Sequence, residues 1–205
     1  HDPLRGRCSR GSCQVTTTRG GLSRPWSFPT KSNNIMNKRT ITHIFVHCTA
    51  TLPTASVESI QQSWRDIGWK NPGYHYVVKP SGEVVSLQPE DKASNGVKGY
   101  NAHAIHVAYI GGIGLHKANP RDVGSAHIED TRTPAQKAAL RALLADIHSR
   151  YPKAVILGHR SIWGEYSPEK WQKVCPCFNA IKEYADIKPH HIIAFLALIF
   201  AVMAC

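Results

Sequence analysis

The chain has 205 residues, of which 42% are apolar, and it carries a formal net charge of +11. This composition excludes a wholly disordered polar chain, and the length suits one domain with extensions. Residues 1–35 hold six Lys or Arg and one Asp, so five of the eleven net charges lie there. The remainder is moderately basic, which suits an anionic partner. No Arg-rich helix or array of aromatic and basic residues favours nucleic acid.

The two ends of the chain differ in composition from the rest. Residues 1–35 are rich in Arg, Gly, Ser, Thr and Pro without an apolar period, which predicts a disordered or non-native leader. No signal peptide with an apolar core is evident there. Residues 189–205 form a short apolar tail of doubtful origin, too short to span a bilayer as a helix. We therefore expect one domain over residues 36–188, without a stable membrane span.

The first regular element is predicted at residues 41–49, where β-branched and aromatic residues alternate with others. His47 stands where this strand ends. Apolar residues at helical spacing predict a helix over 54–68, which Gly68 ends. Strands are expected at 74–79 and 83–87, joined by a short loop containing glycine, and at 104–110.

The second half of the chain begins with a polar segment, 114–132, for which we predict no element. Thr133, Pro134 and Gln136 then form a helix start with a capping box, and the helix is expected to continue to about Tyr151. A short buried strand follows at 154–157, and a last helix is predicted at 178–187.

Three side chains of a metal-binding type stand at the ends of predicted strands or in a loop. His47 ends one strand, His159 follows another, and Cys175 lies in a later loop. Two imidazoles and one thiolate form a zinc site, and a fourth position left to water is typical of a catalytic one. Any one of these residues alone is weak evidence, because the chain has 12 histidines and 6 cysteines. The cysteines form no dense framework, so a reducing compartment is expected.

Seven short motifs carry a resemblance to a known family. They are FVHCTAT (45–51), GYHYVVKPSGEV (73–84), VKGYNAH (97–103), YIGG (109–112), TPAQ (133–136), LGHR (157–160) and KVCPCF (173–178). In this order they resemble the zinc-dependent N-acetylmuramoyl-L-alanine amidases, which include phage lysozyme-type amidases and peptidoglycan recognition proteins. The resemblance covers residues 40 to 185.

The resemblance implies an α/β fold of a single domain, with a central mixed β-sheet flanked by helices and zinc in a surface groove. It implies His47, His159 and Cys175 as ligands of Zn²⁺, and Tyr74 and Lys173 as catalytic side chains. We expect Tyr74 to begin the strand next to the one that carries His47. Lys173 lies two residues before Cys175, so in an extended segment both side chains point the same way.

Substrate contacts are expected from Asn101, His103 and Trp163. In some members of the family a histidine stands where this chain has Gly96, so its role is absent here or moved to His103. The segment between His159 and Cys175 is long and aromatic, and forms either a groove wall or a packed loop. No carboxylate is clearly placed as a general base; Glu165 and Glu169 are weak candidates.

The resemblance implies hydrolysis of the amide bond between N-acetylmuramic acid and L-alanine of peptidoglycan, by a monomer of the phage or prophage endolysin type. Such a protein is made in the cytoplasm and acts on the bacterial cell wall. The alternative is a peptidoglycan recognition module that binds without hydrolysis. Cys175 and Tyr74 favour the enzyme, because recognition-only relatives tend to lack one of them. Binding to nucleic acid is a third, weaker interpretation of the charge.

Overall fold

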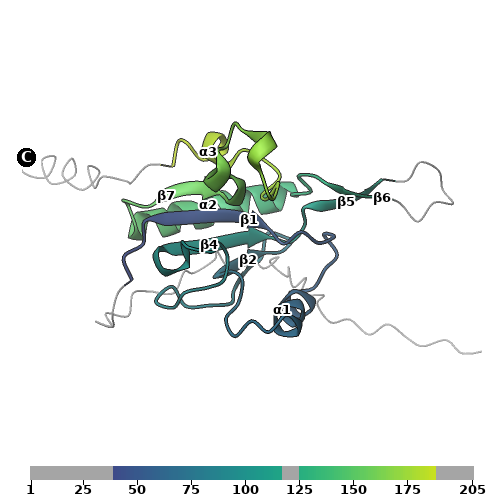
Figure 1. The fold of residues 1–205 in the computed structure, drawn as a ribbon, viewed down its shortest axis with the longest axis horizontal. Coiled ribbons are helices and arrows are strands. Elements are labelled where there is room, and N and C mark those ends of the chain that lie inside the picture. Colours follow the sequence, from purple (N-terminus) through teal and green to yellow (C-terminus); the bar gives the residue numbers. More distant parts are fainter. Residues whose placement is uncertain (1–38, 117–124, 188–205) are drawn as a thin grey trace, which may run out of the picture. The chain divides into compact units, whose positions relative to one another are not determined.

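A computed structural model describes residues 39–116 and 125–187 of the chain. The predicted leader (1–35) and apolar tail (189–205) lie outside these residues. Within them, five strands form one sheet in the order β3-β2-β4-β1-β7 (Figure 1). Their bounds are His43–Cys48 for β1, Tyr76–Val78 for β2, Val84–Ser86 for β3, Ala104–Tyr109 for β4 and Val155–Gly158 for β7.

The central strand β1 is parallel to both of its neighbours, β4 and β7. Strand β2 is also parallel to β4, whereas β3 is antiparallel to β2, so the sheet is mixed. The predicted α/β fold with a mixed sheet flanked by helices is therefore confirmed. The prediction that the Tyr74 strand neighbours the His47 strand is wrong, because β4 lies between β2 and β1. Sequence order gave no sign that a later strand would pair at this position.

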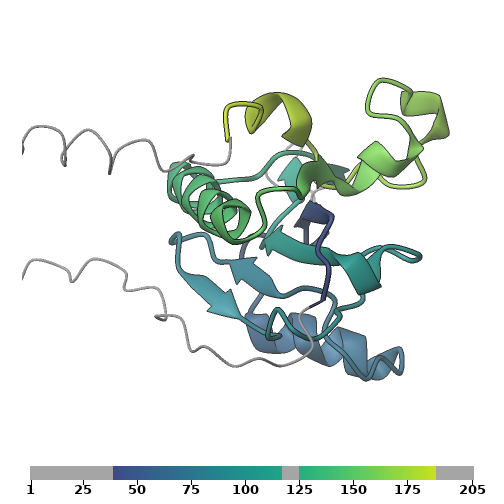
Figure 2. The same cartoon turned by 90° about the vertical axis from the view of Figure 1, so that its left-hand side faces the viewer.

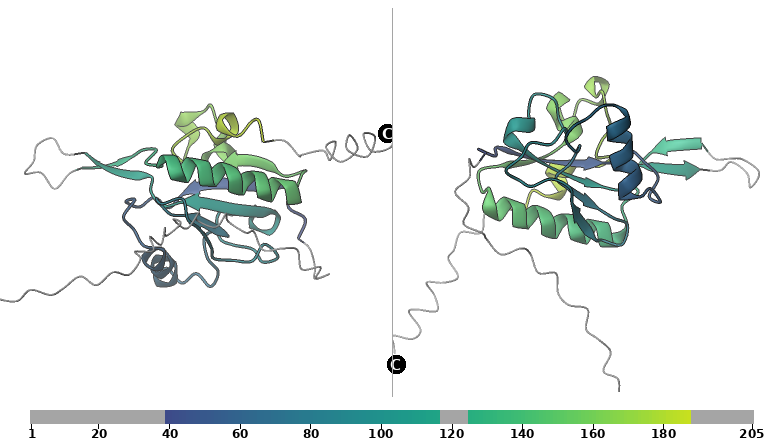
Figure 3. Two further views of the ribbon diagram at one scale, coloured as in Figure 1. Left: turned by 180° about the vertical axis from the view of Figure 1, so that it is seen from behind. Right: turned by 90° about the horizontal axis from the view of Figure 1, so that it is seen from below.

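Helices cover both faces of the sheet, as Figures 2 and 3 show. Helix α2 (Pro134–Arg150) and the short α3 (Ala180–Glu183) pack on one face, where Ile44, Val46 and Cys48 of β1 are buried. Helix α1 (Val57–Asp66) packs on the other face against Val77, Ala108 and Ile110. Because side chains alternate along a strand, His47 and Phe45 point to the face opposite that of α2.

Helix α2 begins as the sequence predicts. The Thr133 hydroxyl accepts a hydrogen bond from the Gln136 N–H at 3.0 Å, and the Gln136 side chain accepts one from the Thr133 N–H. Gln136 is also fully buried, and its amide donates to the carbonyls of Val78 and Ile110. The capping box therefore ties the start of the helix to the ends of β2 and β4.

Replacing Thr133 by alanine is expected to lower the free energy of unfolding by about 1–2 kcal/mol, the usual effect of losing an N-cap. The loss includes the hydrogen bond that the hydroxyl donates to the Pro80 carbonyl at 2.7 Å. Urea unfolding measures the change. Ser149→Ala, at an exposed position in the last turn of the same helix, is the control and should change stability by less than about 0.5 kcal/mol. An equal effect of both substitutions would contradict the role of the cap.

Two segments differ from the sequence-based expectation. The polar segment 114–132 provides most of a two-stranded hairpin, β5 (Ile113–His116) and β6 (Ser125–Ile128), which projects from the sheet in Figure 1. Its strands are too short to give a clear alternating pattern, and Leu115 and Ile128 are exposed. The predicted helix 178–187 is shorter, because Asn179 caps it at Ala180 and it ends at Glu183.

Candidate metal centre and active site

The candidate site lies at the carboxyl ends of β1 and β7. Val46 pairs with Gly158 in parallel register, so the residues that follow them, His47 and His159, come out at the same edge of the sheet. Their ring centroids are 4.9 Å apart. Cys175 reaches the same point from the loop before α3, and the Arg160 N–H donates to its carbonyl at 2.9 Å. The three residues that the sequence nominates as ligands are therefore neighbours in space.

The donor atoms of these residues have the spacing of a small metal site. The ligand atoms of His47, His159 and Cys175 all lie within 4.8 Å of one another, and His47 Nδ1 is 3.7 Å from the Cys175 sulfur. Ideal tetrahedral zinc bonds place nitrogen and sulfur ligands about 3.5 Å apart. The donor set fits zinc with a small inward movement, and three protein ligands leave a fourth position open.

The surroundings keep both imidazoles in the form that binds a metal. Burial, followed by the neighbouring His159, holds the pKa of His47 well below its usual value. Burial also lowers the pKa of His159 to about 4, with a further contribution from Lys173. Both rings are therefore neutral near pH 7. The Cys48 N–H donates to the Cys175 sulfur at 3.2 Å, a contact that stabilises a thiolate.

Tyr74 reaches the site from the loop before β2, although that strand is not adjacent to β1. Its ring centroid is 5.0 Å from that of His47, and its hydroxyl donates to the Cys48 carbonyl at 3.2 Å. Burial, followed by Cys175 and Cys48, raises the pKa of Tyr74 well above its usual value. The phenol therefore keeps its proton and can act as a hydrogen-bond donor.

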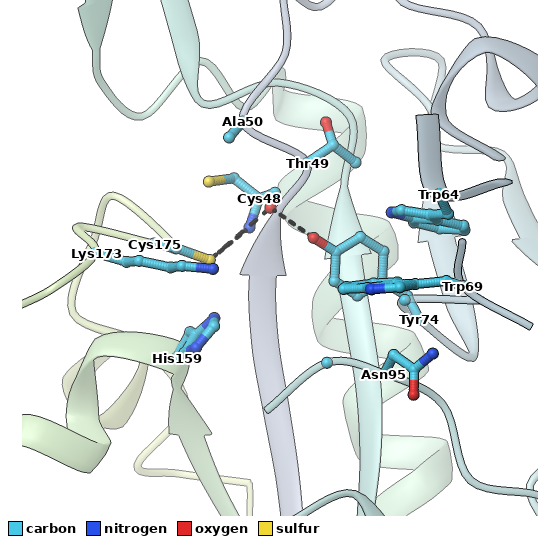
Figure 4. A pocket seen from close by; sticks show the side chains of 12 residues that line it. Cys48, Thr49, Ala50, Trp64, Trp69, Tyr74, Asn95, His159, Lys173 and Cys175 are labelled. Carbon is cyan, nitrogen blue, oxygen red and sulfur yellow. Dashed lines mark hydrogen bonds between the residues drawn. The ribbon is translucent and has the colours of Figure 1, made fainter. Parts of the chain in front are cut away.

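A cavity of about 170 Å³ opens beside these groups. Figure 4 shows Lys173, Cys175 and His159 on one side of β1, with Tyr74, Trp64 and Trp69 on the other. The Trp64 and Trp69 rings are stacked, with centroids 6.5 Å apart. An ammonium group thus faces an aromatic wall across the space next to the candidate ligands.

Residues 37–178 match the family model of N-acetylmuramoyl-L-alanine amidase, which is more than half of the chain. The chain belongs to the N-acetylmuramoyl-L-alanine amidase family. This membership confirms the predicted family and enzyme class, an amidase that cleaves the bond between N-acetylmuramic acid and L-alanine in peptidoglycan.

Individual relatives agree with the family match. This amidase is 36% identical to the endolysin of Klebsiella phage KP32 and to that of Escherichia phage T7. Each of these matches runs over 138 residues, which is 66% of this chain and 80% of the relative. In structure it is similar to the Ph2119 endolysin from a Thermus scotoductus bacteriophage, with a TM-score of 0.53 and 24% identity. That likeness covers 73% of this chain and 86% of the other, and it shows a shared fold.

The three residues expected to contact substrate lie outside the cavity lining. The Asn101 side chain accepts a hydrogen bond from the Val97 N–H, and exposed His103 bonds to the Thr40 carbonyl. Trp163 stacks on His159, with ring centroids 5.5 Å apart. Their contacts with substrate stay a prediction.

The cavity is instead lined in part by residues that sequence reasoning did not nominate for the site, namely Trp64, Trp69, Thr49 and Asn95. The pattern of apolar residues placed Trp64 on the buried face of a helix. Trp69 follows Gly68 and is 38% exposed. The one signal in the sequence was a tryptophan directly after the glycine that ends a predicted helix. Only the folded chain brings Trp69 to the cavity that Tyr74 also lines.

The long segment between His159 and Cys175 is braced by its own side chains. Arg160 forms a buried ion pair with Glu165 at 2.6 Å and lies over the Trp171 ring. The second Glu165 oxygen accepts from Ser161. Both oxygens of Glu165 are thus engaged, which disfavours this residue as a general base. Tyr166 is 80% exposed, and a groove wall formed by this segment stays a prediction.

The other two cysteines of the described region have structural positions. Cys48 is buried in the core beneath α2, as its alternation with His47 predicts. The Cys177 sulfur lies 3.6 Å from the Cys48 sulfur, so it faces the core and not the histidines.

None of the helices in residues 39–116 and 125–187 combines the length and apolar character needed to cross a bilayer.

Proposed function

We propose that this amidase is a zinc-dependent enzyme of the endolysin type, with His47, His159 and Cys175 as the ligands. The observation that carries the proposal is the convergence of two neutral imidazoles and one thiol within 4.8 Å, beside a cavity. Zinc, when bound, activates water as a nucleophile and polarises the carbonyl of the scissile amide.

Two further side chains are proposed to act on the reacting amide. Lys173 lies on the rim of the cavity near the candidate ligands, where its ammonium can stabilise the negative charge that develops on the carbonyl oxygen. The Tyr74 phenol keeps its proton, so it can donate a hydrogen bond to the same oxygen or to the attacking water. This requires its hydroxyl to leave the Cys48 carbonyl, to which it donates at 3.2 Å.

A peptidoglycan recognition module that binds without hydrolysis is the alternative proposal. It needs the cavity but not the donor set or the phenol. Here the three donors, Tyr74 and Lys173 all meet at one edge of the sheet. This complete constellation supports hydrolysis over binding alone.

The endolysin setting is supported by relatives of that name that are 34–36% identical to this chain. We propose that the protein is made in the cytoplasm as a monomer and acts on the peptidoglycan of the bacterial cell wall. We do not assign the basic charge to nucleic acid, since five of the eleven net charges belong to residues 1–35.

Removal of the metal tests the proposed function. The protein as purified is expected to contain about one zinc per chain and to release L-alanine amino groups from peptidoglycan. Dialysis against a chelator should abolish this release, and added zinc should restore it, because the three side chains alone cannot activate water. Binding to insoluble peptidoglycan is measured in parallel. A protein that binds peptidoglycan and contains zinc, yet releases no amino groups, would support the recognition module.

A further inference from the structure

His106 lies next to the candidate ligand His47 and has no role in the constellation described above. It is on β4, on the same face of the sheet as Phe45, with which it is in register. Its side chain is fully buried between two rings, because it stacks on Phe45 at 5.6 Å and on His75 at 5.8 Å between centroids. The ring is therefore held in one orientation.

The held ring presents a nitrogen to His47. Nδ1 of His106 is 3.1 Å from Nε2 of His47, and Nδ1 of His47 faces the Cys175 sulfur. A neutral imidazole that offers Nδ1 to a metal must carry its proton on Nε2. His47 is then the donor of this hydrogen bond and His106 the acceptor, so the proton of His106 is on its own Nε2.

Packing alone does not explain a histidine at this position. Nε2 of His106 has no hydrogen-bond partner among the described residues, although the ring is fully buried. An unpaired buried N–H lowers folding stability, and a phenyl ring would fill the same space between Phe45 and His75 without that penalty. The feature that a phenyl ring cannot supply is the acceptor toward His47.

Gly96, in the loop beside β4, leaves the space that this ring occupies. A β-carbon at Gly96 would lie 2.3 Å from Nδ1 of His106 and 2.4 Å from its Cγ, so any larger residue there displaces the imidazole. The present position of the His106 ring therefore requires glycine at position 96. A role for exposed His103 in binding substrate stays a prediction.

We propose that His106 is a positioning residue of the metal centre, which fixes the tautomer and the ring orientation of His47 by accepting its Nε2 proton. The inference rests on the proposed function, since it takes His47 as a metal ligand. Partners of this kind raise the basicity of a ligating imidazole and orient it, and their loss lowers metal affinity about 10–100-fold.

Three substitutions of the full-length protein separate hydrogen bonding from packing. His106→Asn keeps an acceptor oxygen at the place of Nδ1. His106→Leu has the same branched arrangement of side-chain atoms as asparagine but no acceptor. His106→Phe keeps the stacked ring and removes the acceptor. We would measure zinc affinity by competition with a chromogenic chelator, the absorption spectrum of the cobalt-substituted protein, and the urea unfolding of each metal-free protein.

The Leu and Phe variants are expected to bind zinc about 10–100-fold more weakly than the parent, with an altered cobalt spectrum. The zinc affinity of the Asn variant should stay within about threefold of that of the parent. This holds even if the metal-free Asn variant is less stable than the metal-free Phe variant. If the Leu variant does not fold, the comparison of the Phe variant with the parent decides. Equal zinc affinity and equal cobalt spectra for the Phe variant and the parent would overturn this inference and leave the proposed function standing. A parent protein that binds no zinc would overturn the proposed function and this inference with it.

Discussion

The Cys175→Ser variant is expected to lose its zinc and, with it, the release of amino groups from peptidoglycan. The sulfur is one of three donors within 4.8 Å, and no fourth His, Cys, Asp or Glu joins this group among the described residues. A serine hydroxyl keeps its proton at neutral pH and binds zinc weakly. Loss of a partner behind a ligand lowers metal affinity about 10–100-fold, so loss of the ligand itself should exceed this. Metal analysis and the amidase assay on the same preparation measure both effects.

Cys177→Ser is the matched control for this variant. Cys177 lies two residues away in the same loop, but its sulfur faces Cys48 and the Gly112 carbonyl. The control should retain zinc and most of the activity. If Cys177→Ser loses zinc while Cys175→Ser retains it, the ligand assignment is wrong and the second thiol takes its place.

The second large effect is expected for Lys173→Met. The side chain is exposed on the rim of the cavity, so its replacement leaves the core and the zinc content unchanged. Removal of one donor to a developing oxyanion lowers kcat about 100–1,000-fold. Methionine keeps most of the length of the lysine side chain without its charge. Steady-state kinetics on a soluble muramoyl peptide, together with zinc analysis, give the measurement.

Lys170→Met is the control, because Lys170 is an exposed lysine three residues earlier and does not line the cavity. It should leave kcat and KM close to those of the parent. If Lys173→Met raises KM and leaves kcat unchanged, the ammonium stabilises the bound substrate and the transition state equally, and the specific role at the oxyanion is wrong.

Much of the fold could be predicted from local sequence patterns. Strand β1 and helix α2 were predicted because each combines a clear apolar period with an identifiable end, His47 for one and the Thr133 capping box for the other. The hairpin of β5 and β6 was not predicted, because four-residue strands give no distinct period. The last helix was predicted too long, since its apolar residues continue past the point where the helix ends at Glu183.

The candidate metal ligands could be predicted from the sequence, but some of the side chains around them could not. The motifs around His47, His159 and Cys175 nominated the donors, and the structure brings them together at the ends of β1 and β7. Nothing in the local sequence marked Trp69 as a wall of the cavity or His106 as the partner of His47. Both depend on which side chains meet across the sheet, and periodicity cannot show this.

The sequence by itself therefore determined the family, the class of fold and the residues that offer zinc-binding atoms, because these reside in short motifs whose chemistry is local. Only the tertiary structure decided that β4 separates β2 from β1, and that Tyr74 nevertheless reaches His47 from the loop before β2. It also decided that Gly96 makes room for His106. Strand order and close packing arise from contacts between residues far apart in the chain, and such contacts leave no periodic trace in the sequence.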